Sequence, residues 1–188
     1  MDITSENQLI HSVQNGSLDD FEPFVKKYQK LIFRAINGYV ANPEIAKELT
    51  QETFIKAFEK IHQFQFRSKF STWLYRIAFS LSHNYLKRDG HINTETSLDD
   101  QSEKKLSNPS TVSFEMILEQ QDSNRLIYQA LDTVDLKFRG VLILHAINQI
   151  SYEEIADITG LTMGTVKSRI SRGKQQLKSA LVQQMAHT

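Results

Sequence analysis

Aromatic and cationic side chains alternate through the segment 64–79. In order, they are Phe64, Phe66, Arg67, Lys69, Phe70, Trp73, Tyr75, Arg76 and Phe79. Aromatic rings stack on the faces of unpaired bases, and cationic side chains follow the phosphates of the strand. This mixture is what a binding surface for single-stranded nucleic acid requires.

Several of these rings must instead belong to a core. Trp73, Leu74 and Ile77 have the spacing of a buried helix face, and Trp73 fits a structural role as well as a contact. Phe64 and Phe66 fall in an expected loop, together with the cations that follow them. These two rings are therefore the better candidates for contact with bases.

A second pattern lies near the other end of the chain. Ser151 opens a predicted helix, because its hydroxyl can accept from the amide three residues on while Glu154 reaches back. Gly160 then ends this helix, and Thr162 can cap a second one. Two short helices joined by a glycine-containing turn are typical of a helix-turn-helix unit.

The second of these helices has two contrasting faces. One is apolar and carries Val166, Ile170, Leu177 and Leu181, with Gly173 between them. At about 100° per residue, the opposite side carries Ser168, Ser171, Arg172 and Gln175, flanked by Thr165, Lys167 and Lys178. A solvated charged face is the plain alternative, but no acidic residue balances these bases. The pattern predicts a recognition helix for the major groove of DNA.

Another helix is expected to start at Asn42, which can cap it, with Pro43 at the first helical position. It should run to about His62. Its exposed side presents Glu48, Gln51 and Glu52. Taken alone, this is an ordinary amphipathic helix.

Charge is strongly segregated, although the net charge is zero. No acidic residue occurs in 63–88 or 158–188, whereas 89–135 holds ten acidic residues against three basic ones. The polar stretch that begins at His91 lacks a helical apolar period. We therefore expect an all-α protein of two small domains, 1–90 and 113–188, joined by a flexible acidic linker at 91–112.

Several classes of protein are excluded or disfavoured. The chain has no cysteine, and His62, His83 and His145 are too far apart in sequence for a metal or catalytic motif. We expect no enzyme, no metal and no cofactor. The N-terminus does not resemble a secretory signal, and no apolar run approaches the ~20 residues of a membrane span. A cytoplasmic protein without direct membrane insertion is the expectation.

Four segments together resemble the short sigma factors of the extracytoplasmic-function (ECF) group of the sigma-70 family. They are AKELTQETF (46–54), FSTWLYRIA (70–78), SYEEIA (151–156) and GTVKSR (164–169). The resemblance extends from about Leu9 to Leu181. Each motif alone is modest, but four in this order, with a polar stretch between the second and third, are highly specific.

The resemblance implies a role for each candidate residue. Glu48, Gln51 and Glu52 would dock on the clamp helices of core RNA polymerase. The melted minus-10 strand of promoter DNA would contact Phe64, Phe66, Arg67, Lys69, Ser80 and Asn84, the last two beside a flipped base. The minus-35 duplex would contact Thr165, Lys167, Ser168, Arg169, Ser171 and Arg172, in a domain that also touches the polymerase flap. An anti-sigma factor is expected as a further partner.

Three positions depart from the family pattern. Lys47 replaces one of two acidic residues before the docking glutamine, and Ser80 stands where asparagine is common. A serine cannot make the bidentate contacts of an amide, which leaves the minus-10 preference open. Asp135 stands in place of a proline, and its carboxylate is expected to cap the helix that follows.

One alternative remains from the residues themselves. A stand-alone helix-turn-helix regulator would share the C-terminal unit, but it would have no need of the helix carrying Gln51 or of the aromatic segment. Such a regulator would bind duplex DNA without polymerase.

Overall fold

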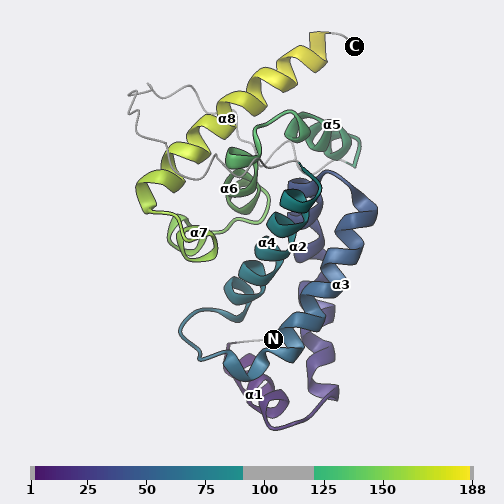
Figure 1. The fold of residues 1–188 in the computed structure, drawn as a ribbon, viewed down its shortest axis with the longest axis vertical. Helices are drawn as coiled ribbons and strands as arrows, with labels where there is room; N and C mark the ends of the chain where they lie inside the picture. Colours follow the sequence, from purple (N-terminus) through teal and green to yellow (C-terminus); the bar gives the residue numbers. More distant parts are fainter. Residues whose placement is uncertain (1–2, 91–120, 187–188) are drawn as a thin grey trace.

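The protein is all-helical throughout the residues that its computed structural model describes, 3–90 and 121–186 (Figure 1). The first part contains α1 (Ile3–Gln14), α2 (Glu22–Val40), α3 (Pro43–Glu59) and α4 (Phe70–Arg88), with 3-10 helices at Asp19–Phe21 and Ile61–Gln63. The second contains α5 (Gln121–Asp132), α6 (Leu136–Ala146), α7 (Tyr152–Thr159) and α8 (Met163–Ala186). The expected all-α fold with two helical domains is confirmed. The expected linker, 91–112, lies outside the described residues.

In the first domain, α2, α3 and α4 pack around one apolar core. Phe24, Ile32 and Leu74 are fully buried in it. The predicted start of α3 is confirmed, because the Asn42 Oδ1 accepts from the amides of Glu44 (3.1 Å) and Ile45 (3.2 Å). The α-helix ends at Glu59, and the 3-10 helix that follows takes the chain past the predicted end near His62.

The second domain is built around α6. Every residue of α6 from Phe138 to Leu144 is buried, because α8 covers one side of this helix and α2 of the first domain covers another. Gly173 lets α8 approach closely: a Cβ atom there would lie 3.3 Å from Leu142 and 3.4 Å from Phe138. The predicted place of Gly173 on the buried face is confirmed.

The helix-turn-helix unit has the predicted local structure. The Glu154 amide donates to the Ser151 hydroxyl (3.2 Å), and the Ser151 amide donates to the Glu154 carboxylate (3.3 Å), which together form a capping box. Gly160 ends α7 in the left-handed conformation, with φ +72°, which glycine adopts without steric cost. The Thr162 hydroxyl accepts from the amide of Thr165 (3.3 Å) at the start of α8.

The expectation that Asp135 caps α6 through its carboxylate is wrong. Asp135 occupies the N-cap position, but its side chain makes no capping hydrogen bond. Its carboxylate instead accepts from the Gln176 amide (2.8 Å), and its own N–H donates to the Gln176 side-chain oxygen (2.9 Å). Gln176 of α8 therefore binds the carboxylate and links the start of α6 to α8.

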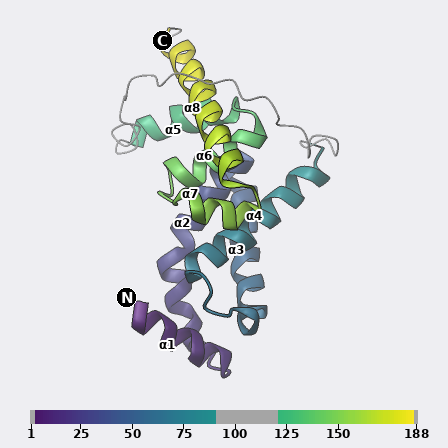
Figure 2. The same cartoon turned by 90° about the vertical axis from the view of Figure 1, so that its left-hand side faces the viewer.

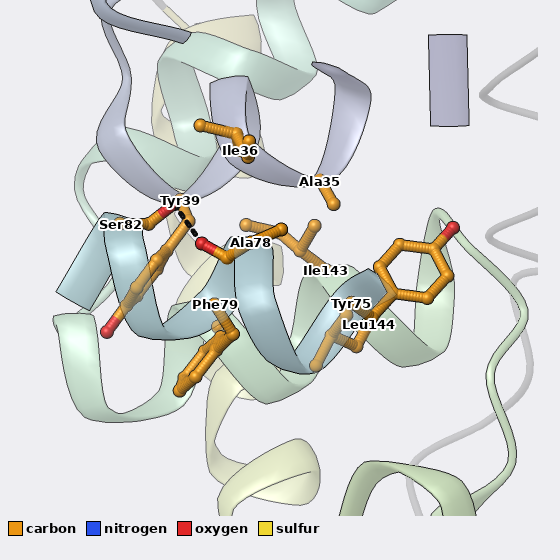
Figure 3. A pocket seen from close by; sticks show the side chains of 10 residues that line it. Ala35, Ile36, Tyr39, Tyr75, Ala78, Phe79, Ser82, Ile143 and Leu144 are labelled. Atoms are coloured by element: carbon orange, nitrogen blue, oxygen red, sulfur yellow. Dashed lines mark hydrogen bonds between the residues drawn. The ribbon is translucent and has the colours of Figure 1, made fainter. Parts of the chain in front are cut away.

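The two domains pack directly against each other, α6 on α2 and α7 on α4 (Figures 1 and 2). Two glycines allow this approach. A Cβ atom on Gly38 would lie 3.0 Å from Ile143, and one on Gly140 would lie 2.7 Å from the ring of Phe79. Figure 3 shows the small pocket that remains at this junction, with Phe79 and Ile143 in its lining.

A buried arginine crosses the same junction. Arg139 is 6% exposed, and its Nε donates to the Val134 carbonyl (3.1 Å) within the second domain. One terminal nitrogen pairs with the Asp132 carboxylate (3.1 Å) and donates to the Tyr39 carbonyl of α2 (3.4 Å). Burial lowers the pKa of Arg139, and Asp132 opposes that shift. The charge is thus paired inside its own domain while it also binds the other one.

Candidate nucleic-acid interface

Phe64 is a core residue, which corrects the expectation that it contacts bases. Its side chain is 5% exposed. Its ring centroid lies 4.9 Å from that of Phe66, 5.6 Å from that of Phe70 and 5.4 Å from that of Trp73. The buried ring is packed among these three side chains, so it offers no exposed surface on which a base could stack. Trp73 is half-buried in the same cluster.

The loop that carries Phe66 is held by α1, a contact that sequence reasoning missed. The Gln14 side-chain amide donates to the carbonyls of Ile61 (2.9 Å) and Phe64 (3.0 Å). The ring of Phe66 lies 4.4 Å from the imidazole of His11, and its backbone is left-handed, with φ +59°. No local pattern links residues so far apart in the sequence. The loop is therefore positioned by tertiary contacts.

Two cations flank this loop on the surface. Arg67 and Lys69 are exposed, and Phe66 between the loop and α1 is half-buried. Lys69 forms an ion pair with Glu154 of the second domain, at 3.0 Å. Positive charge thus surrounds the one candidate ring of the loop that keeps exposed surface, but one of the two cations already has an anionic partner.

Ser80 and Asn84 are one turn apart on α4, and both side chains are exposed. They flank His83, whose Nδ1 lies 3.4 Å from the hydroxyl of Tyr39. Partial burial lowers the pKa of His83, and the nearby Lys87 lowers it further. The two candidate positions therefore present a hydroxyl and an amide beside an imidazole whose neutral form is favoured.

The candidate recognition face of α8 is largely open. Lys167, Ser168 and Ser171 are exposed, and Thr165 and Arg172 are half-buried. The Ser168 hydroxyl donates to the Thr165 carbonyl (3.0 Å), which leaves its oxygen able to accept. Hydroxyls and cations thus occupy the solvent side of α8, which is the composition expected of a face that enters a major groove.

Arg169 differs from these five residues. It is half-buried, and its positive charge acts on the phenol of Tyr39 in the first domain. Burial raises the pKa of Tyr39 to about 12. A helical wheel already separates the positions: Arg169 lies about 60° from Val166, whereas Ser168 lies about 160° away. Arg169 therefore faces the domain junction.

The candidate docking residues form an exposed strip on α3. Glu48, Gln51 and Glu52 all face solvent. Leu49, which lies between them in the sequence, and Phe54, which follows them, are buried. Lys47, the residue that departs from the family pattern, pairs with Glu44 at 3.3 Å rather than with the strip. Ile55, one turn further on, is 57% exposed and extends the strip with an apolar side chain.

Comparison with known families identifies both domains. Residues 24–92 match the family described as Sigma-70 region 2, and residues 124–177 match Sigma-70, region 4. The chain belongs to the sigma-70 family. Within that family it is an ECF sigma factor, because relatives that match 92% of this chain carry that description, and the resemblance drawn from the four motifs is confirmed.

Two relatives illustrate the match. The ECF RNA polymerase sigma factor SigE of Mycolicibacterium smegmatis is 31% identical over 173 residues, which cover 92% of this chain and 66% of that protein. The ECF RNA polymerase sigma-E factor of Escherichia coli K12 is 29% identical over 182 residues, which cover 92% of each. Sigma-factor function is thereby established, and the alternative of a stand-alone regulator is set aside.

Two solved structures share the fold. CnrH, in complex with the cytosolic domain of CnrY, has a TM-score of 0.66 and 20% identity, and covers 92% of this chain and 94% of its own. The sigma factor RpoE of Bartonella quintana, in complex with the anti-sigma factor NepR, has a TM-score of 0.65 and 24% identity, and covers 87% and 98%.

Two searches for other kinds of site found nothing in the described part of the chain. No helix there is both long and apolar enough to cross a membrane. Among the same residues, no three His, Asp or Glu side chains come together as potential metal ligands.

Proposed function

We propose that this sigma factor divides promoter recognition between its two domains. The first domain docks on core RNA polymerase and holds the melted minus-10 strand, and the second binds the minus-35 duplex. The observation that carries this proposal is the exposure of three polar surfaces, on α3, around 66–84 and on α8.

The docking surface is the strip Glu48, Gln51 and Glu52. Two carboxylates and an amide on one exposed face suit a partner that offers cations and amide groups. Clamp helices of the polymerase, the partner implied by the family, would fit this chemistry. Ile55 adds an exposed apolar side chain at the edge of the strip.

The minus-10 surface comprises Phe66, Arg67, Lys69, Ser80 and Asn84. Phe66 offers a ring edge for stacking, the two cations offer contacts to phosphates, and Ser80 and Asn84 offer hydrogen bonds to the edge of an unstacked base. The minus-35 surface comprises Thr165, Lys167, Ser168, Ser171 and Arg172. Its hydroxyls and cations suit base edges and phosphates in a major groove.

Docking is tested by Gln51→Ala combined with Glu52→Lys. These exposed changes should leave the fold intact and reduce co-purification with core polymerase by about tenfold or more. The matched control is Gln8→Ala with Asp19→Lys, which makes similar changes on exposed residues near α1. Equal co-purification by both variants would place the docking surface elsewhere.

Promoter direction is tested by transcription of genomic fragments with core polymerase, followed by sequencing of transcript 5′ ends. Added protein should create a set of start sites that share one minus-10 and one minus-35 element. Start sites identical to those of core polymerase alone would contradict the proposal. The element found in this way supplies the DNA for the tests below.

The remaining partners and setting follow from the same proposal. CnrH and the Bartonella RpoE are complexed with another protein, in the second case an anti-sigma factor. We infer an anti-sigma partner for this chain, action in the cytoplasm where polymerase works, and no catalytic activity of its own. Pull-down of the native protein with mass spectrometry should recover polymerase subunits and one further protein of this kind.

A further inference from the structure

The start of α7 lies across the start of α4, where the minus-10 surface begins (Figure 2). The Glu154 carboxylate pairs with the Lys69 ammonium at 3.0 Å and accepts a hydrogen bond from the Thr72 hydroxyl at 3.4 Å. Lys69 and Thr72 both lie in the acid-free segment 63–88. The second domain thus places an oxyanion against a cation and a hydroxyl of the first.

The other end of α7 makes a related contact. The Nε of Arg76 donates to the carbonyl of Asp157, at 3.1 Å. This carbonyl belongs to the last turn of α7, where backbone oxygens lack partners within the helix and carry its negative dipole end. Two cations of the acid-free segment therefore meet negative groups of the second domain, one at each end of α7.

The charge of Glu154 is well stabilised in this position. Its side chain is 24% exposed, and although partial burial alone would raise its pKa, hydrogen bonds from Lys69 and Ser151 hold the pKa below its usual value. The carboxylate also belongs to the capping box of α7, which fixes its orientation. Glu154 is therefore held in a fixed orientation in its ionised form. It presents negatively charged oxygen to Lys69, as a DNA phosphate would.

Contacts deeper in the junction hold α7 in this place. The Asn148 amide, on the segment before α7, donates to the Tyr75 hydroxyl (2.9 Å) and to the Leu31 carbonyl (3.1 Å). Burial raises the pKa of Tyr75 to about 12, so its hydroxyl stays protonated. Gly38 and Gly140 allow the helices to approach more closely than larger residues would. The two domains therefore meet in a closely packed, hydrogen-bonded interface.

We propose that this packing is an autoinhibited state, in which Glu154 and the end of α7 occupy Lys69 of the minus-10 surface and the neighbouring cation Arg76, which phosphates of the melted strand would otherwise contact. The inference rests on the proposed minus-10 surface and adds its regulation. The second domain competes with single-stranded DNA for the same cations, and separation of the domains exposes them. Most of the α8 recognition face stays open in this state.

The test uses Glu154→Gln in the full chain. Glutamine also serves at the third position of a capping box, so this change removes the charge while keeping the cap. The control is Glu153→Gln, the same charge change on an exposed neighbour for which no contact with Lys69 is found. Binding of a fluorescent thymine-rich single strand, at fixed low salt and without polymerase, should be about twofold to fivefold tighter for Glu154→Gln only.

Equal tightening by both variants would attribute the effect to net charge and overturn the proposal, as would unchanged binding by Glu154→Gln. Domain separation is measured independently by energy transfer, because the chain has no cysteine and labels can be placed at Gln29→Cys and Gln183→Cys. Transfer should fall in Glu154→Gln and stay unchanged in Glu153→Gln. Constant transfer would overturn the autoinhibited state.

A third variant separates this proposal from the minus-10 assignment. Lys69→Gln added to Glu154→Gln should remove the gain in strand binding without restoring energy transfer. If the domains separate but the double variant binds the strand as tightly as Glu154→Gln alone, the minus-10 assignment of Lys69 is wrong while the interdomain contact stands.

Discussion

The two acid-free segments of this sigma factor each carry five Lys and Arg residues, but their exposure in the structure differs. In 63–88, the first candidate ring, Phe64, is buried, and Lys69 and Arg76 are bound by the second domain. In 158–188, Lys167 and Ser171 face solvent. Charge segregation in the sequence thus marks where nucleic acid would bind, whereas interdomain packing decides which surface is available.

The largest effect should come from Phe64→Ala. Removing a buried ring from the aromatic cluster is expected to lower the free energy of unfolding by about 3 to 5 kcal/mol. Arg67→Ala, three residues on, should stay within ~0.5 kcal/mol of the parent because its side chain is exposed. Urea unfolding followed by circular dichroism measures both. A stable Phe64→Ala protein that loses only strand binding would return Phe64 to the contact surface.

The next effect concerns the junction itself. Gly140→Ala places a Cβ atom against Phe79 and should cost about 1 to 3 kcal/mol, as overpacking of a core does. Gly164→Ala is the control, because a Cβ atom there meets nothing within 4 Å and should be neutral or stabilising by ~0.5 to 1 kcal/mol. Thermal unfolding compares the two. Equal unfolding temperatures would mean that the domains do not need this close approach.

The open surface is tested by Arg172→Ala. Binding of holoenzyme to the minus-35 duplex should weaken by about 1 to 3 kcal/mol if this side chain contacts a base, and a phosphate contact would instead reduce the salt dependence across all sequences. Arg169→Ala should have a smaller effect on DNA, because Arg169 faces Tyr39. A larger loss for Arg169→Ala would reverse the assignment of the two arginines.

The smallest effect is the pH dependence of the Lys69–Glu154 pair. Because the pKa of Glu154 is lowered in the packed state, its contribution is complete above the usual pKa of a glutamate and is lost as pH falls through the lowered value. The contribution should be ~0.2 to 1 kcal/mol. Energy transfer between labels at Gln29→Cys and Gln183→Cys should therefore fall as the pH is lowered below the usual pKa of a glutamate. An identical pH profile in Glu154→Gln would show that another group titrates.

Local signals alone were sufficient for much of this protein. Caps and helix ends depend on residues within four positions of each other, so Asn42, the Ser151 capping box and Gly160 could be located from the sequence. The amphipathic spacing likewise placed Gly173 on the buried face of α8, and the outward side of α3 around Gln51. These features rest on backbone geometry that neighbouring residues determine.

Long-range packing decided the rest. The ring of Phe64 is buried against Phe70 and Trp73, in a loop that Gln14 of α1, some fifty residues earlier, holds in place. The Asp135 carboxylate makes no capping hydrogen bond because it accepts one from Gln176 on α8 instead. Lys69 meets Glu154 because α7 of the second domain packs on α4 of the first, at a junction where two glycines allow close approach. In each case a side chain could satisfy more than one partner, and the partner chosen depends on which elements the fold brings together, which no local spacing encodes.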